Sequence, residues 1–199
     1  QWGTIVEIPE PTLSKSARQT EFQNVVPQEL SSIDPNSAVR KQTKIPEMDR
    51  VLGGGLVAGS VVLLGGEPGI GKSTLLLQIA NEIAKAGGSV LYVAGEESAD
   101  QIKIHAQRLS IQGNGIMILE TTQLESVLQA AHSNNPTLMI VDSVQTLHTA
   151  NVDSAYGTIA QIRECTQMIT AHAKEQTITT ILAGHVTKDG DLAGPRLLE

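Results

Sequence analysis

A nine-residue stretch has the residue types and spacing needed to bind the phosphates of a nucleotide. Residues 66–74 match the pattern G-x-x-x-x-G-K-[ST], in which glycines let backbone N–H groups curl around phosphate oxygens. Lys72 would reach the outer phosphates, and the hydroxyl of Ser73 would bind Mg²⁺. A glycine-rich turn with a purely structural role is the alternative. The complete pattern favours a nucleoside triphosphate site made of Gly66, Glu67, Pro68, Gly69, Ile70, Gly71, Lys72, Ser73 and Thr74.

Two carboxylates follow apolar runs in the places where this chemistry needs them. Asp142 ends the run Leu138–Asp142, and a carboxylate there can hold Mg²⁺, directly or through water, beside the loop serine. Glu96 comes just after the run Ser89–Ala94, where it could orient or deprotonate the water that attacks the γ-phosphate. The alternative for Glu96 and Glu97 is a favourable charge at the start of the next helix, a role that suits Glu97 better.

The chain has five histidines, and one of them has a functional context. His185 follows the last predicted strand, where a polar residue can sense the γ-phosphate and pass its presence to the next loop. The other four have neither that context nor metal-ligand spacing, and we interpret them as structural or surface residues: His105, His132, His148 and His172. Cys165 lies in a predicted helix, where we expect a buried small side chain.

These residues must be positioned by alternating strands and helices. The predicted strands are Val61–Gly65, Ser89–Ala94, Gly115–Leu119, Leu138–Asp142 and Thr177–Ala183. The predicted helices are Leu75–Ala86, Ser98–Leu109, Gln123–His132 and Gly157–Lys174, after a short one near Glu47–Leu52 that ends at three glycines. Alternation of this kind predicts an α/β fold, a mainly parallel twisted sheet flanked by helices. Ligands of such sheets bind outside the carboxyl ends of the strands.

The first 44 residues differ in composition from the rest of the chain. They are rich in Ser, Thr, Gln and Pro, and their prolines interrupt any long periodic pattern. We interpret residues 1–44 as an arm or linker, either disordered or docked through its few apolar residues, and residues 45–199 as the nucleotide-binding domain. Both states of the arm remain open.

Composition limits the classes of function. The net charge is −7, and residues 45–199 carry 9 Lys and Arg against 16 Asp and Glu, so any DNA contact must be local. Aromatic residues make up only 2%, which leaves few platforms for stacking nucleic-acid bases. A single cysteine excludes an internal disulfide framework; the first residues do not show the basic-then-apolar pattern of a signal peptide, and no apolar run reaches membrane-spanning length. We expect a cytoplasmic protein without membrane contact.

Several motifs together resemble the RecA-like ATPase core of the bacterial RadA (Sms) family of DNA repair proteins. Besides residues 65–78 around the phosphate loop, the matching stretches are Trp2-x-Thr4, Asp49–Leu56, Tyr92–Ser98, Val141–Thr146 and Gly184–Arg196. The last stretch distinguishes this family from RecA itself and from replicative helicases. The resemblance covers nearly the whole chain and implies a RecA-like P-loop NTPase fold.

The resemblance implies an ATP-dependent motor of the DNA-dependent ATPase or helicase type. Such a motor forms a homo-oligomeric, hexameric ring on single-stranded and branched DNA. It promotes branch migration in homologous recombination with a RecA-type recombinase. Two loops would face the pore, near Thr146–Thr158 and Val186–Arg196. The implied DNA contacts are Lys188, Arg196 and, more weakly, Arg163; Tyr156 would stack on a base or simply be packed or exposed.

Two departures from the family pattern limit these expectations. Family members carry a four-cysteine zinc ribbon before the Trp2 position and a Lys-Asn-Arg-Phe-Gly motif and Lon-like domain after the last match, and none of these is present here. We therefore expect an excised core that binds ATP and Mg²⁺ but no zinc, and that is weakly active alone. The first alternative is a KaiC-like assembly switch or autokinase without DNA binding. The second is an interaction module that binds nucleotide and scarcely hydrolyses it.

Overall fold

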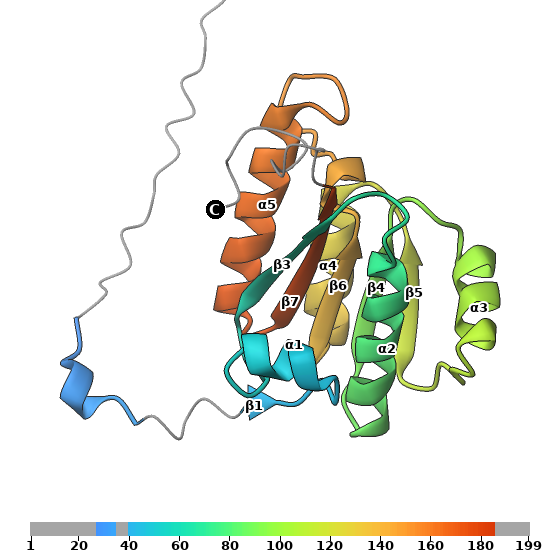
Figure 1. Cartoon of the computed structure of the whole chain (residues 1–199). Helices are drawn as coiled ribbons and strands as arrows, with labels where there is room; N and C mark the ends of the chain where they lie inside the picture. The colour runs from blue at the N-terminus through green and yellow to red at the C-terminus, as the bar shows by residue number, and fades with distance from the viewer. Residues whose placement is uncertain (1–26, 35–39, 186–199) are drawn as a thin grey trace, which may run out of the picture. The chain divides into compact units, whose positions relative to one another are not determined.

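The computed structural model describes residues 27–34 and 40–185. Contacts divide the chain into two units, Gln1–Pro35 and Asn36–Glu199. The described part of the first unit holds one short 3-10 helix, η1 (Leu30–Ser32), whose residues are all exposed. All other described elements belong to the second unit (Figure 1).

The second unit is built on a five-stranded sheet in the order β3-β7-β6-β4-β5. All four neighbouring pairs are parallel, so the described sheet is fully parallel. The strands are β3 (Val61–Gly66), β4 (Val90–Ala94), β5 (Ile116–Glu120), β6 (Leu138–Asp142) and β7 (Thr179–His185). Each of them overlaps one of the five predicted strands, and their carboxyl ends meet at one edge.

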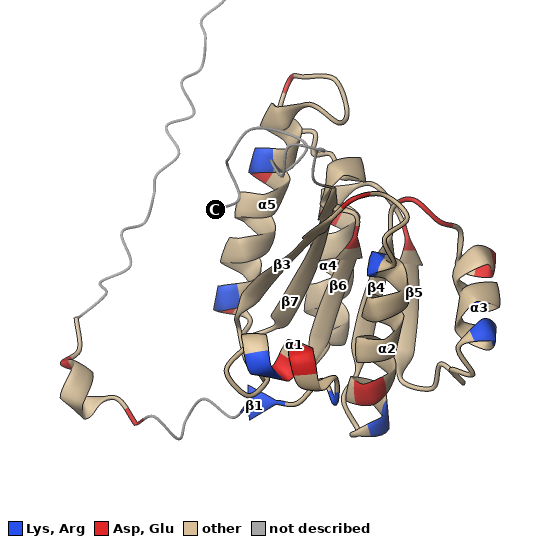
Figure 2. Ribbon diagram, viewed as in Figure 1, with Lys and Arg blue, Asp and Glu red and all other residues tan. Residues whose placement is uncertain are grey.

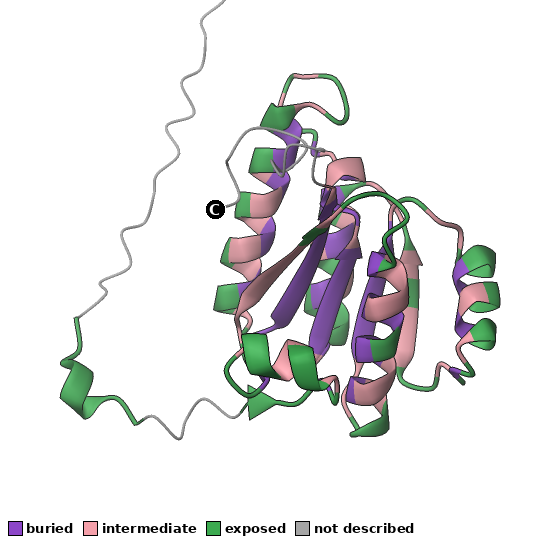
Figure 3. Ribbon diagram, viewed as in Figure 1, coloured by how far each residue is buried: buried purple, intermediate pink, exposed green. Residues whose placement is uncertain are grey.

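Helices cover both faces of this sheet (Figure 1). Alternate residues of β4 show why: Val90 and Tyr92 pack in one apolar cluster, whereas Leu91 and Val93 pack in the other. The first cluster contains α2 (Lys72–Lys85) and α3 (Ala99–Arg108), and the second contains α4 (Leu124–Asn134) and α5 (Ile159–Glu175). The central strands β7, β6 and β4 are therefore buried almost throughout (Figure 3).

Residues 40–44, which the sequence analysis placed in the arm, are part of the second unit. Strand β1 (Arg40–Lys41) pairs antiparallel with β2 (Leu56–Val57), on either side of α1 (Pro46–Val51). Between β1 and α1, Thr43 is buried and its hydroxyl donates to Asp49 Oδ1 at 2.8 Å. The contacts thus divide the chain after residue 35, whereas the sequence analysis divides it after residue 44. Polar residues spaced by prolines do not reveal a two-residue strand whose partner lies 15 positions later.

Helix α2 also begins earlier than predicted, at Lys72 rather than Leu75, because the phosphate loop runs directly into its first turn. Within residues 27–34 and 40–185, none of the helices is both long and apolar enough to cross a membrane. The predicted contacts of residues 1–26 lie outside the described residues.

Candidate functional site

The phosphate loop connects β3 to α2, and its backbone requires glycine at two positions. Gly69 and Gly71 have φ angles of +77° and +106°, a region that side chains with a Cβ rarely adopt. Gly71 is also the N-cap of α2, and no side chain caps this helix within the described chain. Its first N–H groups therefore face the loop without a side-chain acceptor, the arrangement that favours a bound anion.

A cleft of about 260 Å³ opens beside this loop. Residues from five segments line it: Pro68, Gly69, Gly71, Lys72, Ser73, Thr74, Glu96, Glu97, His105, Asp142 and His185. Three of these side chains are carboxylates and one is a lysine, and Figure 2 shows acidic residues along the loop that follows β4. A polyphosphate would thus meet a partly acidic cleft, which favours its entry together with a divalent cation.

A chain of polar contacts joins the phosphate loop to the predicted water-activating carboxylate. The Lys72 ammonium donates to the carbonyls of Gly66 at 2.8 Å and Glu67 at 3.0 Å, and lies 3.2 Å from His185 Nδ1. The Nε2 atom of His185 is 2.7 Å from Glu96 Oε1. The hydroxyl of Ser143, just after β6, donates to that same oxygen.

These contacts fix the charge on Glu96. Partial burial acts to raise the pKa of this carboxyl, but hydrogen bonds from Ser143 and His185 and the positive charge of Lys72 act to lower it and outweigh burial. The pKa of Glu96 is therefore lowered from its ordinary value. At neutral pH the side chain is therefore an anion, the state in which a carboxylate can orient a water molecule and accept its proton.

Asp142 lies at the end of β6 in the same cleft, and a buried tyrosine holds it. The hydroxyl of Tyr92, on β4, donates to Asp142 Oδ2 at 2.7 Å. Burial, followed by the negative charge of Asp142, raises the pKa of Tyr92 well above its ordinary range, while a hydrogen bond from Ser73 acts against this rise. Ser73 and Asp142 thus bring a hydroxyl and a carboxylate into one cleft, and these oxygen ligands fit Mg²⁺.

The structure corrects the interpretation of His105. This histidine, on the last turn of α3, lines the cleft, and its Nε2 atom lies 3.0 Å from the hydroxyl of Thr74. It is neither a surface residue nor remote from the site. No local signal marked His105, because it lies about two turns into α3 and no motif distinguishes the face of this helix that packs toward α2.

The start of helix α3 is stabilised without Glu96 or Glu97. Ser98 and Gln101 form a reciprocal capping box, and the N–H of Ala99 donates to Glu120 at 3.0 Å. Glu97 lines the cleft and, in the described chain, accepts no hydrogen bond at this helix start. Ser98, Gln101 and Glu120 thus anchor the segment that carries Glu96.

Gly95 is a further site residue, which lies within the motif Tyr92–Ser98 but to which the sequence analysis assigns no role. A Cβ on Gly95 would lie 1.9 Å from the Thr146 hydroxyl, and the N–H of Gly95 donates to the carbonyl of Asp142 at 2.8 Å. Thr146 belongs to the short helix η3 (Val144–Thr146) that follows β6. Only a residue without a side chain lets the segment carrying Glu96 lie this close to the strand end that carries Asp142.

Comparison with known proteins gives the family. The profile of the AAA domain matches residues 27–191. The chain belongs to the AAA domain family. It is also 43% identical over 202 residues to the DNA repair protein RadA of Bacillus subtilis (strain 168), and 44% identical over 200 residues to the RadA of Chlamydia trachomatis serovar D. Both matches take in the whole chain but 44% of the relative, so the chain spans less than half the length of these proteins. The resemblance to the RadA family is thereby confirmed.

A solved structure supports the fold of this AAA domain. The KaiC-like protein PH0186 of Pyrococcus horikoshii OT3 superposes with a TM-score of 0.61 at 22% identity, over 77% of this chain and 74% of that one. At this identity the likeness concerns the fold alone. Together with the fully parallel sheet and the phosphate loop, it confirms the RecA-like P-loop α/β fold.

Of the two loops predicted to face the pore, the structure describes Thr146–Thr158, whereas Val186–Arg196 lies outside the described residues. Residues 146–158 contain no Lys or Arg, and Arg163 is exposed on α5. Tyr156 is 73% exposed and its ring stacks on His148 with centroids 3.9 Å apart. The buried side-chain amide of Gln161 holds this loop by donating to the carbonyls of Thr149, Val152 and Ser154. Lys188 and Arg196 lie outside the described residues.

Proposed function

We propose that this AAA domain binds ATP with Mg²⁺ and hydrolyses it to drive the movement of a DNA-processing assembly. The observation that carries the proposal is the contact chain Lys72–His185–Glu96. It connects the residue that would hold the outer phosphates, the residue that would orient water, and the end of β7. RadA relatives support a role in DNA repair and recombination.

The proposed hydrolysis assigns one role to each side chain in the cleft. Lys72 binds the outer phosphate oxygens, and Glu96 orients the attacking water and takes its proton. The water oxygen bonds to the γ-phosphorus as the bond from that phosphorus to the bridging oxygen breaks, leaving ADP and phosphate. Ser73 and Asp142 would hold Mg²⁺, which would supply positive charge to the phosphates. His185 contacts both Lys72 and Glu96 and would respond when a γ-phosphate takes its place beside the lysine.

The DNA-related part of the proposal rests on relatives and on local charge. The described carboxyl edge of the sheet is acidic, so phosphates of DNA would need the basic residues Lys188 and Arg196 of the loop that follows β7. Arg163 and the exposed Tyr156 would add one charge and one stacking surface. We further propose a homo-oligomeric, hexameric ring with helicase-type movement on single-stranded or branched DNA, in the company of a RecA-type recombinase.

The main alternative is a nucleotide-dependent assembly switch or autokinase that does not bind DNA. The absence of Lys and Arg from residues 146–158 favours it. A nucleotide-binding interaction module that scarcely hydrolyses ATP is a further alternative, which single-turnover hydrolysis would separate from the motor.

Binding of labelled single-stranded DNA distinguishes the motor from the switch. Fluorescence anisotropy is measured with Mg²⁺ and a non-hydrolysable ATP analogue, then with ADP, over a salt series. The motor predicts binding that needs the ATP analogue and weakens with salt, with a salt slope smaller by about one for each phosphate-contacting residue removed, as in Lys188→Ala or Arg196→Ala. Lys85→Ala, an exposed lysine at the far end of α2, is the matched control. Absence of DNA binding in both nucleotide states, by a chain that binds nucleotide, would contradict the motor and favour the switch.

A further inference from the structure

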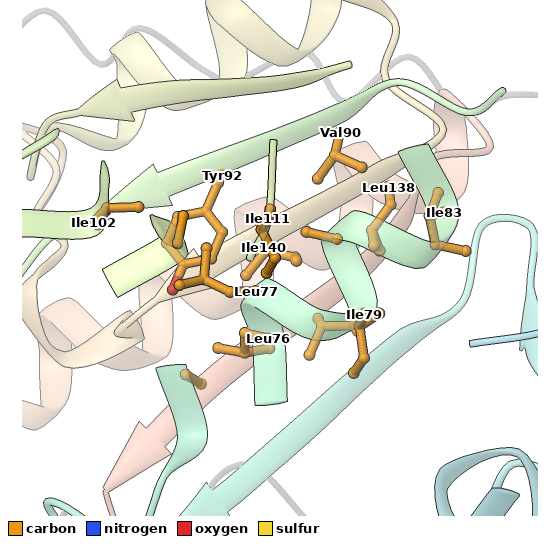
Figure 4. Close-up of a cluster of buried hydrophobic side chains, with 14 of the residues drawn as sticks. Leu76, Leu77, Ile79, Ile83, Val90, Tyr92, Ile102, Ile111, Leu138 and Ile140 are labelled. Carbon is orange, nitrogen blue, oxygen red and sulfur yellow. The ribbon is translucent and has the colours of Figure 1, made fainter. Parts of the chain in front are cut away.

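The chain contains two tyrosines, and their surroundings differ completely. Tyr156 is 73% exposed, whereas Tyr92 is 1% exposed. Figure 4 shows the ring of Tyr92 among the side chains of Leu77 and Ile140, in the apolar cluster beneath α2. A hydroxyl carried into such a cluster loses water and must find a protein partner, which makes its position informative.

The partner of that hydroxyl is one of the two candidate ligands of Mg²⁺. Tyr92 donates to Asp142 Oδ2 at 2.7 Å, and in the described chain no other side chain donates to this carboxylate. Strands β4 and β6 are adjacent and pair Tyr92 with Ile140, which places the tyrosine ring close to the end of β6. The hydrogen bond from this fixed ring therefore restricts the rotation of the Asp142 carboxylate. The buried ring cannot follow if Asp142 turns away.

The other candidate ligand, Ser73, lines the same cleft as Asp142, on the first turn of α2. The hydroxyl of Tyr92 donates its hydrogen bond to Asp142, so the tyrosine acts on the metal site through this carboxylate.

We infer that Tyr92 is a positioning residue of the Mg²⁺ site: it holds Asp142 in the orientation that binds the metal, without touching the metal or the nucleotide itself. The inference rests on the proposed nucleotide and metal site. Partners of this kind, one shell outside the ligands, typically contribute about 10-fold to 100-fold to metal affinity.

The test is the Mg²⁺ dependence of nucleotide binding by Tyr92→Phe, which keeps the ring and removes the hydroxyl. Binding of a fluorescent ATP analogue is titrated with Mg²⁺ and also measured in EDTA. The expected result is a Mg²⁺ midpoint raised about 10-fold, restoration of affinity at high Mg²⁺, and unchanged affinity in EDTA. Tyr156→Phe, the matched control on the exposed loop, keeps the wild-type midpoint.

Three outcomes separate the possible failures. A wild-type chain whose nucleotide binding ignores Mg²⁺ would overturn the metal site itself. A Mg²⁺-dependent wild type with an unchanged midpoint in Tyr92→Phe would overturn the role of Tyr92 alone. If Tyr92→Phe does not fold, the Mg²⁺ midpoint of the single variant Asp142→Asn is compared with that of the double variant Tyr92→Phe/Asp142→Asn. In both of these variants the amide removes the buried charge, so the loss of the tyrosine hydroxyl leaves no charged group without a partner. The inference predicts equal midpoints for these two variants, and a further shift on adding Tyr92→Phe would contradict it.

Discussion

The side chains of Lys72 and His185, 113 positions apart in the sequence, lie 3.2 Å apart between Nζ and Nδ1. An ammonium only donates hydrogen bonds, so Nδ1 of His185 must accept here and its proton must lie on Nε2. The same tautomer lets Nε2 donate to Glu96 at 2.7 Å. One neutral histidine can thus accept a hydrogen bond from Lys72 and donate one to Glu96. A phosphate that binds the Lys72 ammonium would break the contact between the lysine and the histidine.

Glu96→Gln is expected to keep nucleotide affinity and to slow hydrolysis by about 100-fold or more, because the amide can still accept from Ser143 but cannot take a proton. Single-turnover hydrolysis of ATP and equilibrium binding are measured on the same preparation. Glu175→Gln, at the exposed end of α5, serves as the control. Wild-type turnover in Glu96→Gln would move the water-orienting role to another residue.

Gly95→Ala should impair hydrolysis although it touches neither the phosphate loop nor the nucleotide. The added Cβ would lie 1.9 Å from the Thr146 hydroxyl and 3.0 Å from the Thr146 Cβ, so either η3 or the Glu96 segment must move. Hydrolysis is expected to fall by about 10-fold or more, as for other small displacements of reacting groups. Adding Thr146→Ala removes the closest atom and should restore part of the rate. No loss in the single variant would mean that the close approach does not position Glu96.

The charge of Glu96 should stabilise the fold in a defined pH range. Because the pKa of Glu96 is lowered in the folded chain, its stabilising contribution is present above the unfolded value of about 4.5 and is lost as the pH falls through the folded pKa. Glu96→Gln should therefore unfold at lower urea than the wild type at pH 7. The gap in urea midpoint between the two proteins should narrow as the pH falls below about 4.5. A gap of equal size at both pH values would contradict this linkage.

Cys165 should be inert in the native state. Its side chain is fully buried on α5, and burial, followed by the charges of Glu125 and Glu164, raises the pKa of the thiol to about 12. A thiol-reactive dye at pH 8 should label the folded chain very slowly and the urea-unfolded chain completely, because only the thiolate reacts. Rapid labelling of the folded chain would show that α5 opens locally.

Much of this architecture could be predicted because its determinants are local in the sequence. The apolar runs that form β4 and β6, and the turn from β3 into α2, follow from residue type and spacing alone. Glu96, Asp142 and His185 could be nominated because parallel strands end at the same edge of a sheet. Their roles stay predictions, although one cleft brings all three together.

Other features depend on packing between distant segments and left no local signal. The hydroxyl of Tyr92 meets Asp142 only because β4 and β6 are neighbours, an order that composition does not specify. His105 reaches Thr74 because α3 packs beside α2, and Gly95 matters because η3 crosses close to it. Strand β1 could not be recognised without β2. Each of these features becomes visible only when two elements are placed side by side.

The most direct test of the central claim is calorimetric titration of ATP with Mg²⁺ into the wild-type chain, Lys72→Ala and Lys85→Ala. Both lysines belong to α2, but only Lys72 lines the cleft, and the side chain of Lys85 is 65% exposed. Loss of a hydrogen-bonded charge contact predicts an affinity at least about 10-fold weaker for Lys72→Ala. Lys85→Ala should bind as the wild type does. Equal affinities for all three proteins would show that the nucleotide does not bind at this loop.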